Sequence, residues 1–478
     1  MNAIRGEYLT AYRQFYKQPN NPQLLFQLLD QAVVNDSERA FMRYVEDFLI
    51  LNIDDNIDMA LAVFYSSLYY KMKRYTRFDY LTPAPYLAIS RTGEQITSAV
   101  PPYNDCSAQN HPKTAIILHG LESTQGLGPF YLALMQQATC SQNYHIISLL
   151  RSDEFVNVSI GVNAFRSTGA KVFMPESKTF ARRVIEIAQY LKHVSPEIVI
   201  FQQLYLAPLA ALLFPYVRSN CKVVARFAHQ QPELYYDKRV DLTIVPKALS
   251  HEVFAKKMLT IPWPVDTNLV DKSYPPLKQQ LDLDPNCKVM VAVGRKVKMR
   301  HPDFWSFCQR VLTDEPNLHL VCYGVTVQDI AGLVNRKMLE ERRILPMGYD
   351  AEASGKIKDA DIFLNTFPMG GGSTIAEAYY QGLPVVAYYF DSNKVAVDLS
   401  NGAAHLVSTY YNNASELFPE YGDMDGLYRL VRKLLNDPEF YKQFQKSRAI
   451  KKEELRPEFF MKSLEQELLY LRNQKSLL

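Results

Sequence analysis

Short apolar runs alternate with helical patterns from residue 113 onward, and this alternation restricts the fold more than any other feature. Runs this short and apolar are typical of strands that are covered on both faces. A chain that alternates strands with helices makes right-handed crossovers, which place its strands in a parallel, doubly wound sheet. The first set of predicted strands covers 114–118, 145–149, 171–174, 198–201, 222–227 and 242–245, with helices at 130–139, 178–193 and 204–217.

A second set of the same kind follows the proline-bearing segment IPWPVDTNLVD at 261–271. Two such sets predict two facing doubly wound domains, 113–260 and 261–478, with helices from 424 onward closing the second. Ligands of such sheets bind beyond the carboxyl ends of the strands, so two facing domains create one cleft. The strands of the second set are predicted at 289–293, 319–323, 344–347, 362–365 and 385–388, with a helix at 302–313.

Residues 1–75 have a different pattern, which predicts an all-helical domain. Apolar residues such as Leu24, Leu25 and Leu28 recur there at helical spacing. The stretch 76–112 contains five prolines and is predicted to be a linker or loosely packed loops. The predicted fold class is therefore α/β, with an all-α N-terminal domain ahead of two facing Rossmann-like domains. The predicted N-terminal helices are 2–17, 21–35, 37–52 and 55–73.

The composition excludes several functional classes. Of the 478 residues, 47% are hydrophobic and 22% are charged, as in ordinary globular proteins. A net charge of only +3 argues against a dedicated nucleic-acid-binding protein. The six cysteines are scattered without a CxxC pair, so neither a metal site nor a disulfide framework is expected. No apolar run is long enough to cross a membrane, and the N-terminus lacks a signal core, so a cytoplasmic protein is expected.

The segment DIFLNTFPMGGGSTIAEAYYQGLPVVA, at 361–387, predicts a buried strand, a glycine turn, a helix and a second strand. Ser373 and Thr374 could cap that helix, which should end near Gly382. A helix N-terminus beyond the carboxyl end of a strand favours an anion such as a nucleotide diphosphate. The spacing matches neither GxxxxGK[ST] nor GxGxxG, and a glycine triplet can also serve a purely structural turn.

Two further groups of polar residues follow predicted strands. Arg295, Lys296 and Lys298 come directly after 289–293, so they should project into the cleft, although a solvated basic turn would have the same sequence. These cations could stabilise the negative charge of a diphosphate.

On the first domain, His119 and Glu122 follow the strand 114–118. His119 is the leading candidate for a general base or for a residue that positions an acceptor, because imidazole exchanges protons near neutral pH. Glu122 is the competing base. His229 and Gln230 follow the strand 222–227 and could line the cleft.

These motifs resemble those of the GT-B glycosyltransferases. TIPWPVDTNLVD is similar to their inter-domain segment. FPMGGGSTIAEAYYQGLPVVA and VAVGRKVKMRHPDFWSF most resemble the cytoplasmic N-glycosyltransferases that modify bacterial adhesins, which are relatives of the O-linked N-acetylglucosamine transferase. Those enzymes also carry an all-helical domain ahead of the GT-B core.

The resemblance implies a transferase that uses a nucleoside-diphosphate sugar, by analogy a UDP-sugar, without a metal or other cofactor. It implies that Lys298 or Lys296, with Arg295, binds the diphosphate. Residues 371–374 (Gly371, Gly372, Ser373 and Thr374) would contact phosphate oxygens, and Glu377 would hold the ribose. The implied acceptor is a polypeptide, and a glycan is the alternative. The letters of a metal-binding DxD occur at 359–361, but they precede a strand and suit a capping segment better.

The chain departs from the resembling families at two positions. Retaining GT-B enzymes often have a glutamate eight residues before the position of Glu377, where this chain has Met369. This difference favours an inverting displacement. The adhesin enzymes have a histidine-rich loop before the nucleotide strand, whereas this chain has GYDAEASGKIKDAD.

Other readings of the same sequence remain open. The chain could be a non-catalytic GT-B subunit that helps a partner transferase to recognise its substrate. It could also be a sugar-nucleotide epimerase of the same fold, although the helical N-terminal domain would then have no obvious task. A phosphorylase that uses pyridoxal phosphate would need a longer chain.

Overall fold

The structure is a computed structural model of the chain. It describes residues 112–476 except 122–127, 155–157, 203–207, 228–238, 246–256, 369 and 390–403. Before residue 112 it describes 90 and 92–103, together with positions 14, 17, 18, 21, 23–25, 27, 28 and 44. Most of the predicted N-terminal helical domain therefore lies outside the described residues.

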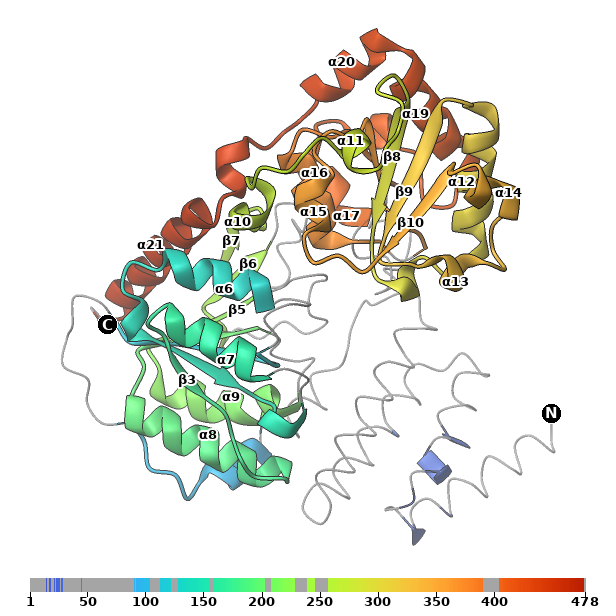
Figure 1. Ribbon diagram of the computed structural model, residues 1–478. Coiled ribbons are helices and arrows are strands. Elements are labelled where there is room, and N and C mark those ends of the chain that lie inside the picture. Colours follow the sequence, from blue (N-terminus) through green and yellow to red (C-terminus); the bar gives the residue numbers. More distant parts are fainter. Residues whose placement is uncertain are drawn as a thin grey trace.

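The described chain forms two lobes, each built on a parallel sheet (Figure 1). This arrangement confirms the α/β part of the predicted fold class, which is a pair of doubly wound domains. The first sheet has the strand order β3-β2-β1-β4-β5-β6-β7. Its strands are β1 (Thr114–Leu118), β2 (Tyr144–Ser148), β3 (Lys171–Phe173), β4 (Ile198–Phe201), β5 (Val223–Phe227), β6 (Leu242–Val245) and β7 (Met258–Thr260).

Alternate residues of the central strand β1 enter two different cores, because successive side chains of a strand point to opposite faces. Ala115 and Ile117 pack with the helices on one face of the sheet, and Ile116 and Leu118 pack with those on the other. The first face is covered by α8 (Phe180–Val194) and α9 (Pro208–Asn220), and the second by α6 (Gly128–Gln137) and α7 (Val158–Ser167).

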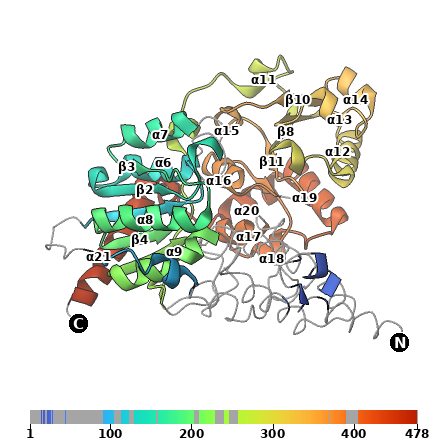
Figure 2. The ribbon, with the colours of Figure 1, turned by 90° about the horizontal axis from the view of Figure 1, so that it is seen from below.

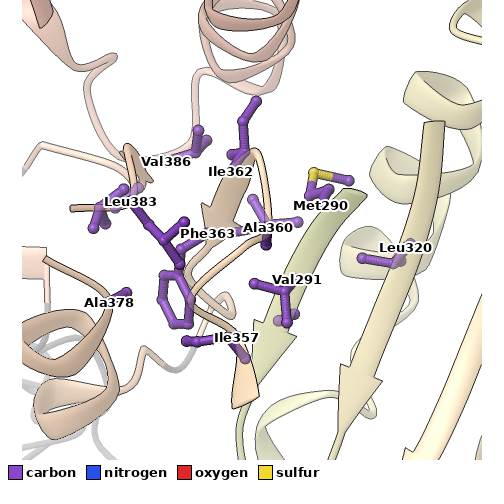
Figure 3. Packing of buried hydrophobic residues seen from close by; sticks show 14 of the residues in the cluster. Met290, Val291, Leu320, Ile357, Ala360, Ile362, Phe363, Ala378, Leu383 and Val386 are labelled. Carbon is purple, nitrogen blue, oxygen red and sulfur yellow. The ribbon is translucent and has the colours of Figure 1, made fainter. Parts of the chain in front are cut away.

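The second sheet has the order β10-β9-β8-β11-β12. Figure 3 shows Ile362 and Phe363 of β11 in its core, beside Met290 and Val291 of β8. The strands are β8 (Lys288–Val293), β9 (Leu318–Tyr323), β10 (Ile344–Gly348), β11 (Ile362–Leu364) and β12 (Val385–Val386).

Helices surround this second sheet, and the first of them lies within the inter-domain segment. They are α10 (Thr267–Val270), α11 (Leu277–Gln280), α12 (Pro302–Asp314), α13 (Val327–Ile330), α14 (Arg336–Glu340), α15 (Ala353–Lys356), α16 (Gly372–Tyr380), α17 (Ala404–Tyr410), α18 (Ala414–Leu417), α19 (Met424–Asn436) and α20 (Pro438–Lys446).

The last helix, α21 (Pro457–Ser476), does not close the second domain as the sequence predicted. Phe460, Met461, Leu464 and Leu468 of this helix are buried in the core of the first sheet. Figures 1 and 2 both show α21 beside the first lobe, whereas α19 and α20 lie on the second. Its apolar face completes the cover over the same side of the sheet as α6.

The described part of the predicted linker is more ordered than expected. Residues 92–97 are helical, and Val100 is buried in the core next to α9. Gly93 lies so close to α9 that an added Cβ would stand 2.0 Å from the Leu212 carbonyl oxygen. The number of prolines predicted loops. It could not reveal the close contact with α9, which depends on the absence of a side chain at Gly93.

Candidate functional site

The glycine turn, Gly370 to Gly372, follows the carboxyl end of β11 and leads into α16. The buried Asn365 stabilises it, because its Oδ1 accepts a hydrogen bond from the Gly371 N–H at 2.9 Å. Gly371 is the N-cap of α16, and no side chain caps the helix. The prediction that Ser373 and Thr374 cap the helix is therefore wrong, because both lie within its first turn.

This uncapped end has the properties of an anion site. The first N–H groups of a helix have no partner within the helix and carry a partial positive charge. The Thr374 Oγ1 is buried and has no hydrogen-bond partner among the described groups. A Cβ at Gly371 would stand 2.4 Å from that oxygen, so glycine is required for the hydroxyl to lie against the turn.

Lys298 connects the neighbouring turn, after β8, to the glycine turn. It ends the 3₁₀ turn Lys296–Lys298, and its Nζ donates to the Gly370 carbonyl oxygen at 2.5 Å. Burial, with a smaller contribution from the positive charge of Arg295, lowers the pKa of Lys298 to about 8. The structure thus brings together Lys298 and residues 370–374, as the sequence predicted for a diphosphate site.

Lys296 and Arg295 are placed differently. Both are exposed, and the Lys296 ammonium forms an ion pair with Asp329 of α13, at the end of the next strand. Hydrogen bonds from Lys296 and from Thr326 lower the pKa of Asp329 to about 2. Lys296 is therefore engaged away from the glycine turn, and Lys298 is the better candidate of the two lysines.

Glu377 lies on α16, one turn beyond the glycine turn, and faces α15. The Ser354 hydroxyl donates a hydrogen bond to its carboxylate. Burial raises the pKa of Glu377, the bond from Ser354 opposes that rise, and the negative charge of Asp266 adds to it.

Ser354 was not singled out from the sequence, where it appears only as one polar residue in a loop. Asn365 was missed as well, although a polar residue at the end of a buried strand is a usable signal.

The first-domain candidates are only partly described. His119 follows β1 and is exposed, and its backbone N–H donates to the Gln202 Oε1 at 2.7 Å. Glu122, His229 and Gln230 lie outside the described residues, so their predicted roles stay predictions.

A shallow pocket opens beside the glycine turn. Three of its eight lining residues are aromatic. The lining consists of Asn365, Thr366, Phe367, Pro368, Gly370, Ala387, Tyr388 and Tyr421. Within the described ranges, no cluster of three His, Cys, Asp or Glu side chains could hold a metal ion. No helix in the described part of the chain is both long and apolar enough to span a membrane.

Comparisons with known proteins place this geometry in a fold. A scan against models of protein families gave no match, and a search of curated proteins gave none. Among solved structures, a mutant O-GlcNAc transferase of Thermobaculum terrenum is 13% identical with a TM-score of 0.54, covering 98% of this chain and 87% of that one. A glycosyltransferase of Rickettsia africae is also 13% identical with a TM-score of 0.54, covering 77% of this chain and 99% of that one. This chain has the GT-B fold of glycosyltransferases.

Proposed function

We propose that the protein is a glycosyltransferase that takes its sugar from a nucleoside-diphosphate donor, by resemblance a UDP-sugar. One observation carries this proposal. A half-buried lysine, Lys298, meets an uncapped helix N-terminus whose first turn contains a buried, unbonded hydroxyl, that of Thr374. The two similar solved structures, an O-GlcNAc transferase and a glycosyltransferase, support glycosyl transfer.

The arrangement suits the departure of a nucleotide diphosphate. Negative charge grows on the diphosphate as the bond to the sugar breaks, and cations and N–H groups already in position stabilise it. Lys298 would exchange the Gly370 carbonyl for a phosphate oxygen, and Thr374 with the first N–H groups of α16 would bind the other oxygens. The positive groups come from the chain itself, so the proposed reaction needs no metal.

Glu377 would hold the nucleotide ribose, because a carboxylate can accept hydrogen bonds from both ribose hydroxyls. Its partner Ser354 fixes the carboxylate in the direction of α15. The sugar would then extend towards the first domain, where His119 or Glu122 would serve as the base. We favour a polypeptide acceptor and an inverting displacement, on the resemblance and on Met369 at the position of the missing glutamate.

The test is calorimetric titration with UDP, followed by assays of UDP-sugar hydrolysis and of transfer to candidate polypeptides. A hydrogen bond to a charged group contributes about 1.5–3 kcal/mol, so Lys298→Met should weaken UDP binding roughly 10- to 100-fold. Lys337→Met is the matched control, because Lys337 is exposed on α14. Equal UDP affinity in the two variants would refute the proposed site.

A further inference from the structure

The chain crosses between the two domains at two places that lie side by side. The first crossing runs from Ile261, buried in the first domain, to Val265, buried in the second. The second runs from Leu455 in the second domain to Phe460 in the first. The Val265 N–H donates to the Leu455 carbonyl oxygen at 2.9 Å, so the two crossings are joined by a backbone hydrogen bond.

Asp271 gathers groups from three elements next to these crossings. It is the C-cap of α10, the helix that follows the first crossing. Its Oδ2 accepts the Tyr380 hydroxyl at 3.0 Å and the Arg456 Nη2, in the second crossing, at 3.1 Å. The Lys452 Nζ lies 3.7 Å from its Oδ1. One carboxylate, at the end of the helix that follows the first crossing, therefore joins the second crossing to Tyr380.

Tyr380 is the last residue of α16, whose first turn forms the candidate diphosphate site. Its ring is buried, and the Lys452 ammonium lies 4.2 Å from the ring centre. A helix of nine residues is about 13 Å long and transmits displacement as a rigid element. A shift of α16 on nucleotide binding would therefore reach Asp271 directly.

The contacts of Asp271 are suited to rearrangement. The side chains of Asp271, Arg456 and Lys452 are 38%, 40% and 50% exposed. Ion pairs this exposed contribute little to folding stability. They do fix the position of Tyr380 relative to Arg456, however, because the Tyr380 hydroxyl and the Arg456 guanidinium both donate to a single carboxylate oxygen. The cluster can therefore change partners at low cost while still responding to the position of α16.

We propose that Asp271 is a positioning residue that couples the diphosphate site, through Tyr380 and α16, to the two inter-domain crossings. Nucleotide binding at the first turn of α16 moves its last turn against Asp271. The contact between Asp271 and Arg456 then changes, and the angle between the two domains changes with it. The inference rests on the proposed function, because it requires the nucleotide at that end of α16.

The chain contains a suitable reporter of this coupling. It has two tryptophans, and Trp263 lies in the first crossing with its ring centre 5.8 Å from that of Phe460 in the second. The other, Trp305, is buried in the second domain, and its Nε1 donates to the Met299 carbonyl oxygen beside Lys298. Trp305→Phe would remove this direct signal from the site and leave Trp263 as the only tryptophan.

The experiment follows Trp263 emission and calorimetric UDP affinity in the full chain carrying Trp305→Phe. UDP should change the emission of this parent. Adding Asp271→Asn, which keeps the shape but removes the charge, or Tyr380→Phe should abolish the emission change while UDP affinity falls less than about 5-fold. A purely structural role of Asp271 would instead leave the emission change intact. Small-angle scattering of the chain that retains Trp305 repeats the comparison if Trp305→Phe does not fold.

The matched control is Asp425→Asn, which breaks an exposed ion pair with Arg310 at 2.6 Å, away from the crossings. This variant should behave like the parent. If the parent does not bind UDP, the proposed function falls and this inference falls with it. If UDP binds and Asp271→Asn still gives the parental change in emission or scattering, the inference alone is overturned.

Discussion

Lys298 is the residue on which the candidate site depends most, and its environment works against its charge. Burial favours the neutral amine, and the nearby Arg295 favours it further, which brings its pKa to about 8. A diphosphate would offset both effects, because its negative charge stabilises the charged ammonium. The charged form of Lys298 is therefore disfavoured in the free protein and favoured when a diphosphate is bound. This difference contributes to the affinity for the ligand.

A pH dependence of nucleotide binding follows from this pKa. Lys298 is mostly charged below pH 8 and loses its proton above it, so UDP affinity should fall as the pH rises from 7 to 9. Each further pH unit well above 8 should cost up to about 10-fold, because binding must then take up a proton. Lys298→Arg keeps its charge throughout this range and should show a flat profile, measured by titration at several pH values. A parallel decline in both proteins would assign the titration to another group.

At the scale of single elements, the sequence predicted the structure best where an apolar run is followed directly by turn-forming residues. The apolar run of β11, the glycines after it and the end of α16 near Gly382 were all predictable, and Gly382 does adopt a φ of +93°. The helix cap was not predictable in the same way. Ser373 and Thr374 suit a cap by residue type, but Asn365 already bonds the Gly371 N–H, which moves the start of α16 to Gly372.

Site contacts between separate elements were harder to predict than the elements themselves. Lys296 and Lys298 look equivalent in sequence, and only the position of α13 with Asp329 separates their roles. Two elements, the short strand β7 and the helix α7, were also not predicted from the sequence. The bonds from Ser354 to Glu377 and from Lys298 to Gly370 join residues 23 and 72 positions apart, and no local pattern records such distances.

Gly324 tests how strictly the turns after β8 and β9 are packed together. Its φ is +104°, and an added Cβ would stand 1.8 Å from the Gly294 carbonyl oxygen, just before the turn that carries Lys298. Gly422 has a similar φ of +92° but no atom within 4 Å of such a Cβ. Gly422→Ala should therefore cost only the strain, about 1 kcal/mol, whereas Gly324→Ala should cost at least 3 kcal/mol and weaken UDP binding. Thermal unfolding and UDP titration measure both; equal costs would show that the two turns can move apart.

At the scale of the whole molecule, α21 packs the last described part of the chain against the first of the two sheets. The sequence predicts that this segment is a helix, but its apolar face does not reveal which of two sheets it will cover. Polar contacts add to the apolar ones, because Arg472 donates to both carboxylate oxygens of Glu197, and Lys475 pairs with Asp241. Glu197 and Asp241 directly precede β4 and β6, so polar contacts hold the last turns of α21 while apolar contacts hold its earlier turns.

Arg472 provides a test of how much this attachment stabilises the first domain. The side chains of Arg472 and Glu197 are only 10% and 4% exposed, so Arg472→Met leaves a buried carboxylate with Lys222 as its remaining ion-pair partner among the described residues. Removing one partner of a buried pair costs about 3 kcal/mol, and replacing both by methionine should restore most of the loss. The control Gln466→Ala, on the exposed face of α21, should stay within about 0.5 kcal/mol of the parent. Urea unfolding of the four proteins decides the matter: a loss no larger than that of the control would mean that the apolar face of α21 alone holds it to the first sheet.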